Sequence, residues 1–196
     1  NKTVDSQTNR GYHQMAEKEI ITLDLNTLEY RAAKKAAFGT LELTKTIDKP
    51  IDRFKVLVKG KDKAGEFYRK SFSGMFAYVS NRIPEISDEL YKIDDAMKAG
   101  FGWENGPFEI WDAIGVEKGI EIMKAEGLEP AAWVTEMLDS GSKSFYSIKE
   151  GATYFYNIPT KAQTKVPGQD AFIILNHIRE SKKVWNNSGA IIQDLG

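Results

Sequence analysis

The chain has 196 residues, of which 41% are hydrophobic and 11% aromatic, so it can bury a core and is not a wholly disordered protein. Its formal net charge of −1 argues against a general nucleic-acid binder, because such proteins usually carry a basic excess. Without cysteine it has no disulfide, thiolate metal site or cysteine nucleophile, and no apolar run approaches the roughly 18 residues of a membrane-spanning helix. The polar N-terminal stretch does not resemble a signal peptide, and we expect a cytoplasmic location.

The N-terminal part is polar up to about residue 26, and we interpret residues 1–26 as a linker from a preceding domain. Thr27 is a plausible N-cap, and it predicts a helix that includes Tyr30 and the AAKKAAF stretch. Further on, Pro50 follows a turn and predicts the first residue of a short helix that reaches Val58.

A long helix is predicted to begin near Asp62, with one apolar stripe formed by Phe67, Phe72, Phe76, Val79 and Ile83. Pro84 removes a backbone donor, so we expect a kink or a restart of the helix there. Ser87 then leads into a second apolar pattern formed by Leu90, Ile93 and Met97.

The next stretch reads IDDAMKAGFGWENGPFEIWDAIG and combines a helical pattern with several glycines. Gly100 is predicted to be the left-handed cap of one helix, and Pro107 to be the first residue of the next. Later glycines give similar stops, so four helices are predicted to end at Gly100, Gly115, Gly127 and Gly141. Pro130 is expected to open the last of them. This regularity predicts a mainly α, multi-helix domain.

The composition changes after Gly141. Aromatic and turn residues from Phe145 to Val166 predict a strand or hairpin region. A helix is predicted from Ala171 to about Lys183, and Ser188 to Leu195 reads as the start of a strand.

Two glycine patterns resemble nucleotide-binding loops. Gly100, Gly102 and Gly106 spell GxGxxxG, but a predicted helix rather than a strand precedes them, so we favour a cap and turn. Gly60 to Gly65 imitates half a phosphate loop, but Glu66 stands where lysine is required. Neither pattern predicts a cofactor site.

Catalytic side chains are few. His13 lies in the polar leader and His177 in a predicted helix, and we favour a surface or interface role for His177. A two-histidine metal site is not expected. Five carboxylates lie close together in the sequence, namely Glu85, Asp88, Glu89, Asp94 and Asp95. The spacing of Glu85, Asp88 and Glu89 predicts that these three lie on a solvent-facing side of a helix.

The glycine-rich stretch resembles the signature of the helical C-terminal domain of 3-hydroxyacyl-CoA dehydrogenases. The resemblance extends loosely over about Tyr30 to Tyr146 and is carried by Ile93-Asp94, Ala96-Met97, Gly100-Phe101-Gly102-Trp103, Gly106-Pro107-Phe108, Asp112 and Gly115. It implies a helical domain like the C-terminal domain of 6-phosphogluconate dehydrogenase, with a short β-containing tail. Its structural motif includes Gly100, Gly102, Trp103, Gly106, Pro107, Trp111 and Asp112.

The resemblance also implies a domain order, with residues 27–141 as the helical domain and residues 142–196 as a linker and truncated entrance to a crotonase-like hydratase. The short segment between Asn81-Arg82 and Ile93-Asp94 suggests the second of two helical units. Its implied partners are a preceding nucleotide-binding domain, a preceding helical domain, the hydratase domain and, in a homodimer, a second subunit. No nucleic-acid partner is expected.

The implied function is a non-catalytic domain of a fatty-acid β-oxidation enzyme that oxidises 3-hydroxyacyl-CoA with NAD. In this family the histidine base and the cofactor site belong to the nucleotide-binding domain, so the chain is expected to hold no catalytic, cofactor-binding or metal-binding residue. Asn81 is the one candidate for substrate contact, since FAYVSNR is similar to the family's FxVNR helix. On this reading the domain supports acyl-CoA binding and packing.

Two other functions remain open at this point. The first is a stand-alone helical module that binds acyl-CoA without chemistry. The second is a small hydrolase or isomerase built on the carboxylates, which the lack of an evident nucleophile–base pair disfavours.

Overall fold

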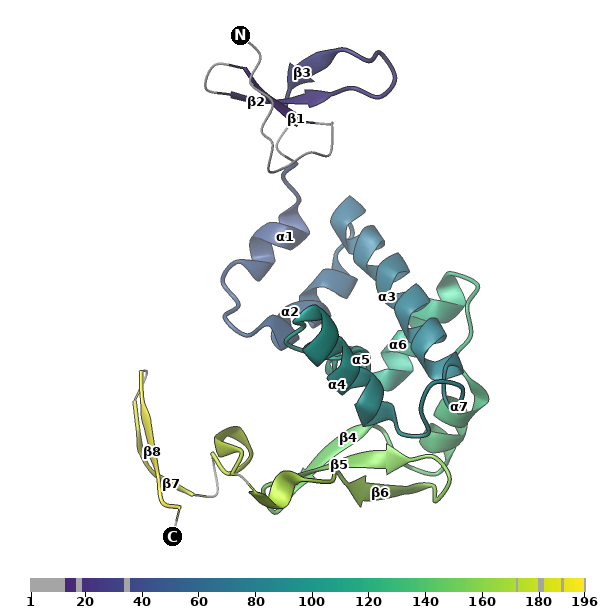
Figure 1. The fold of residues 1–196 in the computed structure, drawn as a ribbon, viewed down its shortest axis with the longest axis vertical. Helices are drawn as coiled ribbons and strands as arrows, with labels where there is room; N and C mark the ends of the chain where they lie inside the picture. Colours follow the sequence, from purple (N-terminus) through teal and green to yellow (C-terminus); the bar gives the residue numbers. More distant parts are fainter. Residues whose placement is uncertain are drawn as a thin grey trace. The chain divides into compact units, whose positions relative to one another are not determined.

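The computed structural model describes residues 13–16, 19–33, 36–171, 173–179, 182–187 and 189–195. The chain divides into two units, Asn1–Ala37 and Phe38–Gly196, which are described separately. Within the described residues the structure is mainly helical, with seven α-helices and eight short strands (Figure 1). The mainly α prediction is confirmed, while the likeness to the 6-phosphogluconate dehydrogenase domain stays a prediction. None of these helices has the length and hydropathy needed to cross a lipid bilayer.

The first unit contains a three-stranded antiparallel sheet of β1 (His13–Ala16), β2 (Glu19–Leu23) and β3 (Tyr30–Ala32), in that order. The helix predicted from Thr27 is therefore wrong. A turn at Asp24, whose carboxylate accepts from the Asn26 N–H at 3.0 Å and the Arg31 Nε at 3.0 Å, reverses the chain. It places β3 against β2, so sheet pairing overrides the helical propensity of Ala32, whereas Lys34 and Lys35 lie outside the described residues.

The second unit begins with helices α1 (Gly39–Thr44), α2 (Pro50–Lys59) and α3 (Lys63–Asn81). Pro50 is the first residue of α2, as predicted. Asp62 caps α3 as predicted, and its Oδ1 accepts from the Gly65 N–H at 3.0 Å. The same carboxylate accepts from the backbone N–H of the buried Thr40 at 2.9 Å and from its hydroxyl at 2.7 Å, which fixes α1 to the start of α3.

Four further helices complete the helical part, namely α4 (Leu90–Phe101), α5 (Pro107–Ile114), α6 (Val116–Ala125) and α7 (Ala132–Asp139). The restart after Pro84 and the helix start at Pro107 are confirmed. Helix α3 packs against α2, α5 and α6. Ser80 ties α7 to α3, because its hydroxyl accepts from the Ala131 N–H at 3.1 Å and its carbonyl from the Trp133 indole at 3.0 Å.

An antiparallel meander follows, formed by β4 (Tyr146–Lys149), β5 (Ala152–Asn157) and β6 (Ala162–Lys165), with β5 in the centre. The strand region predicted from Phe145 to Val166 is confirmed. Strand β5 packs against α4 (Figure 1). Its Phe155 and Tyr156 are buried in the same core as the helices. The meander is therefore part of the packed domain, and the hydrophobic core of the helices continues into residues beyond Gly141.

The described part of the C-terminal region contains two 3₁₀ turns, Gln169–Ala171 and Leu175–His177, and a hairpin of β7 (Lys183–Asn186) and β8 (Ile191–Gln193). The α-helix predicted from Ala171 to about Lys183 is wrong, because the described residues of this range form short 3₁₀ turns and the start of β7. The predicted strand before Leu195 is present as β8, although Ser188 lies outside the described residues. Its partner is β7, which the sequence did not suggest.

The core is aromatic and continuous from the helices to the meander. Trp111 is fully buried and stacks on Phe76 with ring centroids 4.7 Å apart, and Phe145 lies 5.0 Å from the Trp111 ring. Phe67, predicted as part of the buried stripe, is instead 63% exposed. It lies five residues before Phe72, a spacing that places the two on different faces of a helix.

Candidate functional site

The glycine-rich turn connects α4 to α5. Helix α4 continues through Gly100 and ends at Phe101, and its cap, Gly102, takes the left-handed conformation with φ of 67°. The predicted cap at Gly100 is therefore wrong by two residues. Gly100 and Gly102 both permit the left-handed conformation. The position at which α5 must start decides that Gly102 adopts it. Gly115, Gly127 and Gly141 have positive φ after their helices, as expected.

Asp94 lies at the centre of this region and is fully buried. Its Oδ1 accepts from the Phe108 N–H at 2.9 Å, and its Oδ2 accepts from the Glu109 N–H at 3.1 Å and from the Tyr146 hydroxyl at 2.9 Å. The two N–H groups belong to the first turn of α5, where a helix has no internal acceptors. Asp94 of α4 thus satisfies the start of α5 and holds β4 to both helices.

Gly106 is required by this arrangement, because a Cβ on it would overlap the Asp94 carboxyl group. Its N–H donates to Glu109 Oε2 at 2.8 Å, which closes the N-terminus of α5, and Lys98 donates to Glu109 Oε1 at 2.8 Å. Pro107 then supplies a first helical residue that needs no acceptor. The GxGxxxG pattern is a helix junction, as predicted.

Asp112, on α5, makes a second connection to the meander. Its Oδ1 accepts from the Phe145 N–H and its Oδ2 from the Tyr146 N–H, both at 2.8 Å. Trp111 donates from its indole nitrogen to the Val116 carbonyl at 3.1 Å. Asp94 and Asp112 together therefore connect α4 and α5 to the meander.

Burial sets the charge properties of this network. It raises the pKa of Asp94 to about 7 and that of Asp112 to about 7, while the donated hydrogen bonds act in the opposite direction. Burial and the adjacent Asp94 raise the pKa of the Tyr146 hydroxyl, so it remains a donor. Every oxygen of the two aspartates accepts a hydrogen bond from within the chain, which favours a structural role over a reactive one.

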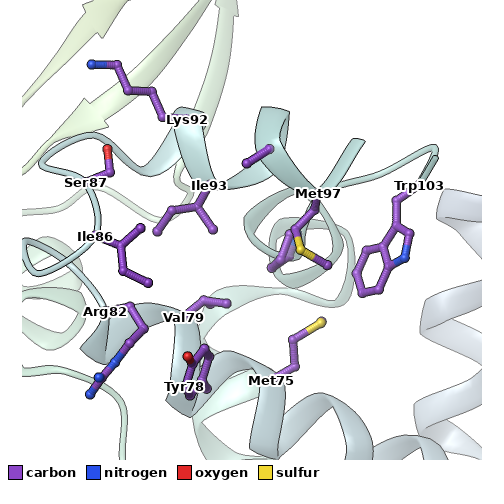
Figure 2. A pocket seen from close by; sticks show the side chains of 12 residues that line it. Met75, Tyr78, Val79, Arg82, Ile86, Ser87, Lys92, Ile93, Met97 and Trp103 are labelled. Atoms are coloured by element: carbon purple, nitrogen blue, oxygen red, sulfur yellow. The ribbon is translucent and has the colours of Figure 1, made fainter. Parts of the chain in front are cut away.

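An apolar groove of about 540 Å³ lies between α3 and α4, beside the junction (Figure 2). Met75 and Met97 lie at one end with Trp103, and Arg82, Ile86 and Ser87 lie at the other (Figure 2). The remaining lining residues are Tyr78, Val79, Lys92, Ile93, Ala96 and Pro107. Trp103, a residue of the resembling signature, is 38% exposed at this groove. Concave apolar grooves of this kind commonly bind a ligand or a partner protein.

The two charged residues that line the groove are both basic. Arg82 pairs with Glu85 at 2.6 Å and lies over the Tyr78 ring at 5.3 Å, yet its buried Nε has no hydrogen-bond partner among the described residues. Lys92 pairs with Glu89 at 2.7 Å. Both basic groups at this end of the groove are thus already paired with glutamates of the same chain.

Asn81 is the last residue of α3, and its side-chain amide donates to the Ala77 carbonyl at 2.9 Å. It is exposed and does not line the groove, so its contact with substrate stays a prediction. His177 Nδ1 lies 3.2 Å from the Gly151 carbonyl, and the side chain of His13 lies outside the described residues. Within the described ranges, no three His, Asp or Glu side chains are placed to hold a metal.

Sequence reasoning missed both the groove and the burial of Asp94. Asp94 was grouped with its charged neighbours, although it follows Leu90 by four residues and therefore shares its buried helix face. That spacing was the available signal. The partner Tyr146 lies 52 residues away and had no local signal. The groove depends on how α3 and α4 lie side by side, which their separate patterns do not reveal.

Residues 85–154, which include the junction, match the sequence profile of the family described as 3-hydroxyacyl-CoA dehydrogenase, C-terminal domain. The probable 3-hydroxyacyl-CoA dehydrogenase of Bacillus subtilis is 37% identical over 194 residues, which is 98% of this chain and 24% of that protein. No solved structure matches the chain significantly.

Two putative fatty acid oxidation complex trifunctional enzymes are also similar. That of Rickettsia felis is 27% identical over 93 residues, which is 47% of this chain and 11% of the relative. That of Rickettsia prowazekii is 26% identical over 102 residues, which is 52% of this chain and 12% of the relative. The chain thus spans about a quarter of the Bacillus protein and about a tenth of the other two.

Proposed function

Residues 85–154 belong to the 3-hydroxyacyl-CoA dehydrogenase C-terminal domain family, and from this premise we propose that the chain is a non-catalytic helical part of a fatty-acid β-oxidation dehydrogenase. In this proposal the complete enzyme oxidises 3-hydroxyacyl-CoA with NAD bound to another domain. The chain supports acyl-CoA binding and packs against the other domains or a second subunit. Its place as the second of two helical units, followed along the polypeptide by a hydratase domain, is part of the same proposal.

One observation carries the proposal. The polar residues of the family signature are occupied in holding the fold, since Asp94 and Asp112 together accept four backbone N–H groups and one hydroxyl. A general base must instead reach the proton of a bound substrate. The signature therefore specifies a rigid junction, and the open apolar groove beside it offers a surface for packing.

The test is a steady-state assay of the purified chain with NAD and a 3-hydroxyacyl-CoA, followed by NADH absorbance. The expected result is no turnover above buffer, with the Bacillus subtilis relative as a positive control. Turnover by the chain itself that Asp94→Asn abolishes without unfolding the protein would refute the non-catalytic role.

The groove also favours a second candidate, a module that binds acyl-CoA by itself. An acyl chain suits an apolar groove of about 540 Å³, and Arg82 and Lys92 suit an anionic head group. Calorimetric titration of the chain with acyl-CoA separates the two candidates. Saturable micromolar binding favours the module, whereas heats equal to those of dilution favour the packing role.

A further inference from the structure

The sequence contains a single Asn-Gly pair, and it lies in the glycine-rich turn, at Asn105–Gly106. An asparagine followed by glycine is chemically labile, because glycine has no Cβ to keep the asparagine side chain away from the next backbone nitrogen. Asn105 is half-buried, while Gly106 is buried and is the N-cap of α5. The labile pair therefore lies at the start of the helix that the junction holds in place.

The reaction that threatens such a pair is deamidation, which needs only water. The Gly106 backbone nitrogen loses its proton and forms a bond to the Asn105 Cγ, while the bond from Cγ to the side-chain nitrogen breaks and ammonia leaves with a proton. Water then opens the cyclic imide at one of its two carbonyls. The products are aspartate and isoaspartate, and in isoaspartate the main chain runs through the side-chain carboxyl carbon.

The attacking nitrogen is held by a hydrogen bond in the folded chain. The Gly106 N–H donates to Glu109 Oε2 at 2.8 Å, which is the backbone contact of a capping box. Lys98 in turn donates to Glu109 Oε1 at 2.8 Å and fixes the carboxylate. Closure of the imide ring removes the Gly106 proton, so the reaction must break the cap of α5.

Packing restricts the same piece of backbone from the other side. The Asp94 side chain lies so close to Gly106 that a Cβ there would overlap it. Asp94 also accepts from the Phe108 and Glu109 N–H groups, which fixes the first turn of α5. The Gly106 nitrogen therefore cannot approach the Asn105 Cγ freely, and ring closure requires the junction to open.

We propose that Asn105–Gly106 is a site of spontaneous deamidation, and that the capping box of α5 protects it while the junction is closed. The inference does not depend on the proposed function. The pair reacts only in the open state, so its rate follows the fraction of molecules in which the junction is open. The product places a new carboxylate next to Glu104 and near Glu109, and isoaspartate also lengthens the main chain before α5. Opening is thereby converted into permanent damage to the junction.

Glu109 has two opposite ways to influence the reaction. A general base would take the Gly106 proton and promote ring closure, whereas a cap keeps the N–H in place and suppresses it. The structure favours the cap, because Lys98 and the Gly106 N–H already engage the two carboxylate oxygens. A carboxylate is also a far weaker base than the amide anion that loss of the proton would create.

The experiment measures deamidation in the full 196-residue chain. The unchanged chain, Glu109→Ala, Glu109→Gln and a control, Glu117→Ala, are kept at neutral pH below their melting temperatures, and mass spectrometry of proteolytic fragments follows the conversion of Asn105. Glu117 is a matched control, because it is an exposed acid in the first turn of α6. The unchanged chain unfolded in urea gives the unprotected rate. Circular dichroism establishes that each variant folds.

The expected result is fast conversion of Asn105 in the unfolded chain and much slower conversion in the folded chain, with isoaspartate among the products. Glu109→Ala accelerates the reaction roughly fivefold, the factor that corresponds to loss of a typical N-terminal cap. Glu109→Gln keeps an acceptor oxygen for the Gly106 N–H and stays near the unchanged rate, as does Glu117→Ala. If Glu109→Ala does not fold, Glu109→Asp replaces it, because its shorter side chain no longer reaches the Gly106 N–H.

Three results would overturn the inference. Equal rates in the folded and unfolded chains would show that the junction gives no protection. Slower conversion in both Glu109→Ala and Glu109→Gln would show that the carboxylate promotes the reaction as a base. A folded Glu109→Ala that reacts at the unchanged rate would show that the cap is not what protects the pair.

Discussion

Replacement of Asp94 by alanine tests whether the signature carboxylate holds the fold. The substitution leaves the Phe108 N–H, the Glu109 N–H and the Tyr146 hydroxyl without their acceptor in a buried site. A buried donor left unsatisfied costs about 1–3 kcal/mol, and relief of the buried charge offsets part of the sum. We expect Asp94→Ala to lower the free energy of unfolding by about 4 kcal/mol, a large fraction of the 5–15 kcal/mol typical of a domain.

Urea denaturation followed by circular dichroism and tryptophan fluorescence measures this loss. Asp94→Asn keeps the shape of the side chain and one acceptor oxygen. It should therefore lower the free energy of unfolding by about 2 kcal/mol, less than Asp94→Ala does. Asp139→Ala removes an exposed carboxylate from the end of α7 and should change stability by no more than about 0.5 kcal/mol. If Asp94→Ala stays within about 1 kcal/mol of wild type, the reasoning that gives this junction a structural role is wrong.

Three further predictions follow from the same packing. Burial raises the pKa of Asp94 and Asp112 to about 7, so between about pH 4.5 and pH 7 the folded state holds protons that the unfolded state has released. The urea concentration at the unfolding midpoint should therefore decrease as the pH rises from about 4.5 to 7, and it should decrease less steeply in Asp94→Asn. Gly106→Ala should lower the melting temperature severely, because its Cβ overlaps Asp94, whereas Gly74→Ala should stabilise the protein by about 0.5–1 kcal/mol. Equal melting temperatures of the two variants would contradict this prediction. Trp111→Ala should cost about 3–5 kcal/mol in urea unfolding, and an unmoved midpoint would show that the ring does not support the core.

Local signals in the sequence predicted much of the helical part. Pro50 and Pro107 begin helices, Asp62 caps one, and the glycines at 115 and 127 follow others, because each preference depends on the backbone of a few adjacent residues. The family signature likewise identified the junction, since its glycines, proline and aspartates must keep a fixed order and spacing.

The failures share a different cause. Phe67 and Trp103 are aromatic but partly or largely exposed, and Gly100 has the residue type of a cap but lies inside α4. In each case residue type alone suggested one outcome and the position of the residue in the fold determined another. For Phe67 that position was already indicated by its five-residue spacing from Phe72. The helix expected at Tyr30 failed similarly, because pairing with β2 outweighed alanine propensity.

The candidate site could be predicted only in part. The structural role of Asp112 was suggested by the resemblance, but its donors, Phe145 and Tyr146, lie more than 30 residues away. The groove needs two helices at a particular separation, and the free donor on Arg82 becomes visible only when its neighbours are in place. Such features arise from packing over long sequence distances, which periodicity does not encode.

The most direct test of the central claim is exchange of this chain for its counterpart in the Bacillus subtilis relative, followed by measurement of NADH formation from a 3-hydroxyacyl-CoA. The account predicts that the hybrid keeps dehydrogenase activity, that deletion of the segment abolishes it, and that the isolated chain has none. An inactive hybrid that is folded and binds NAD, or an enzyme that works equally well without the segment, would contradict the claim that this chain is a supporting domain of a 3-hydroxyacyl-CoA dehydrogenase.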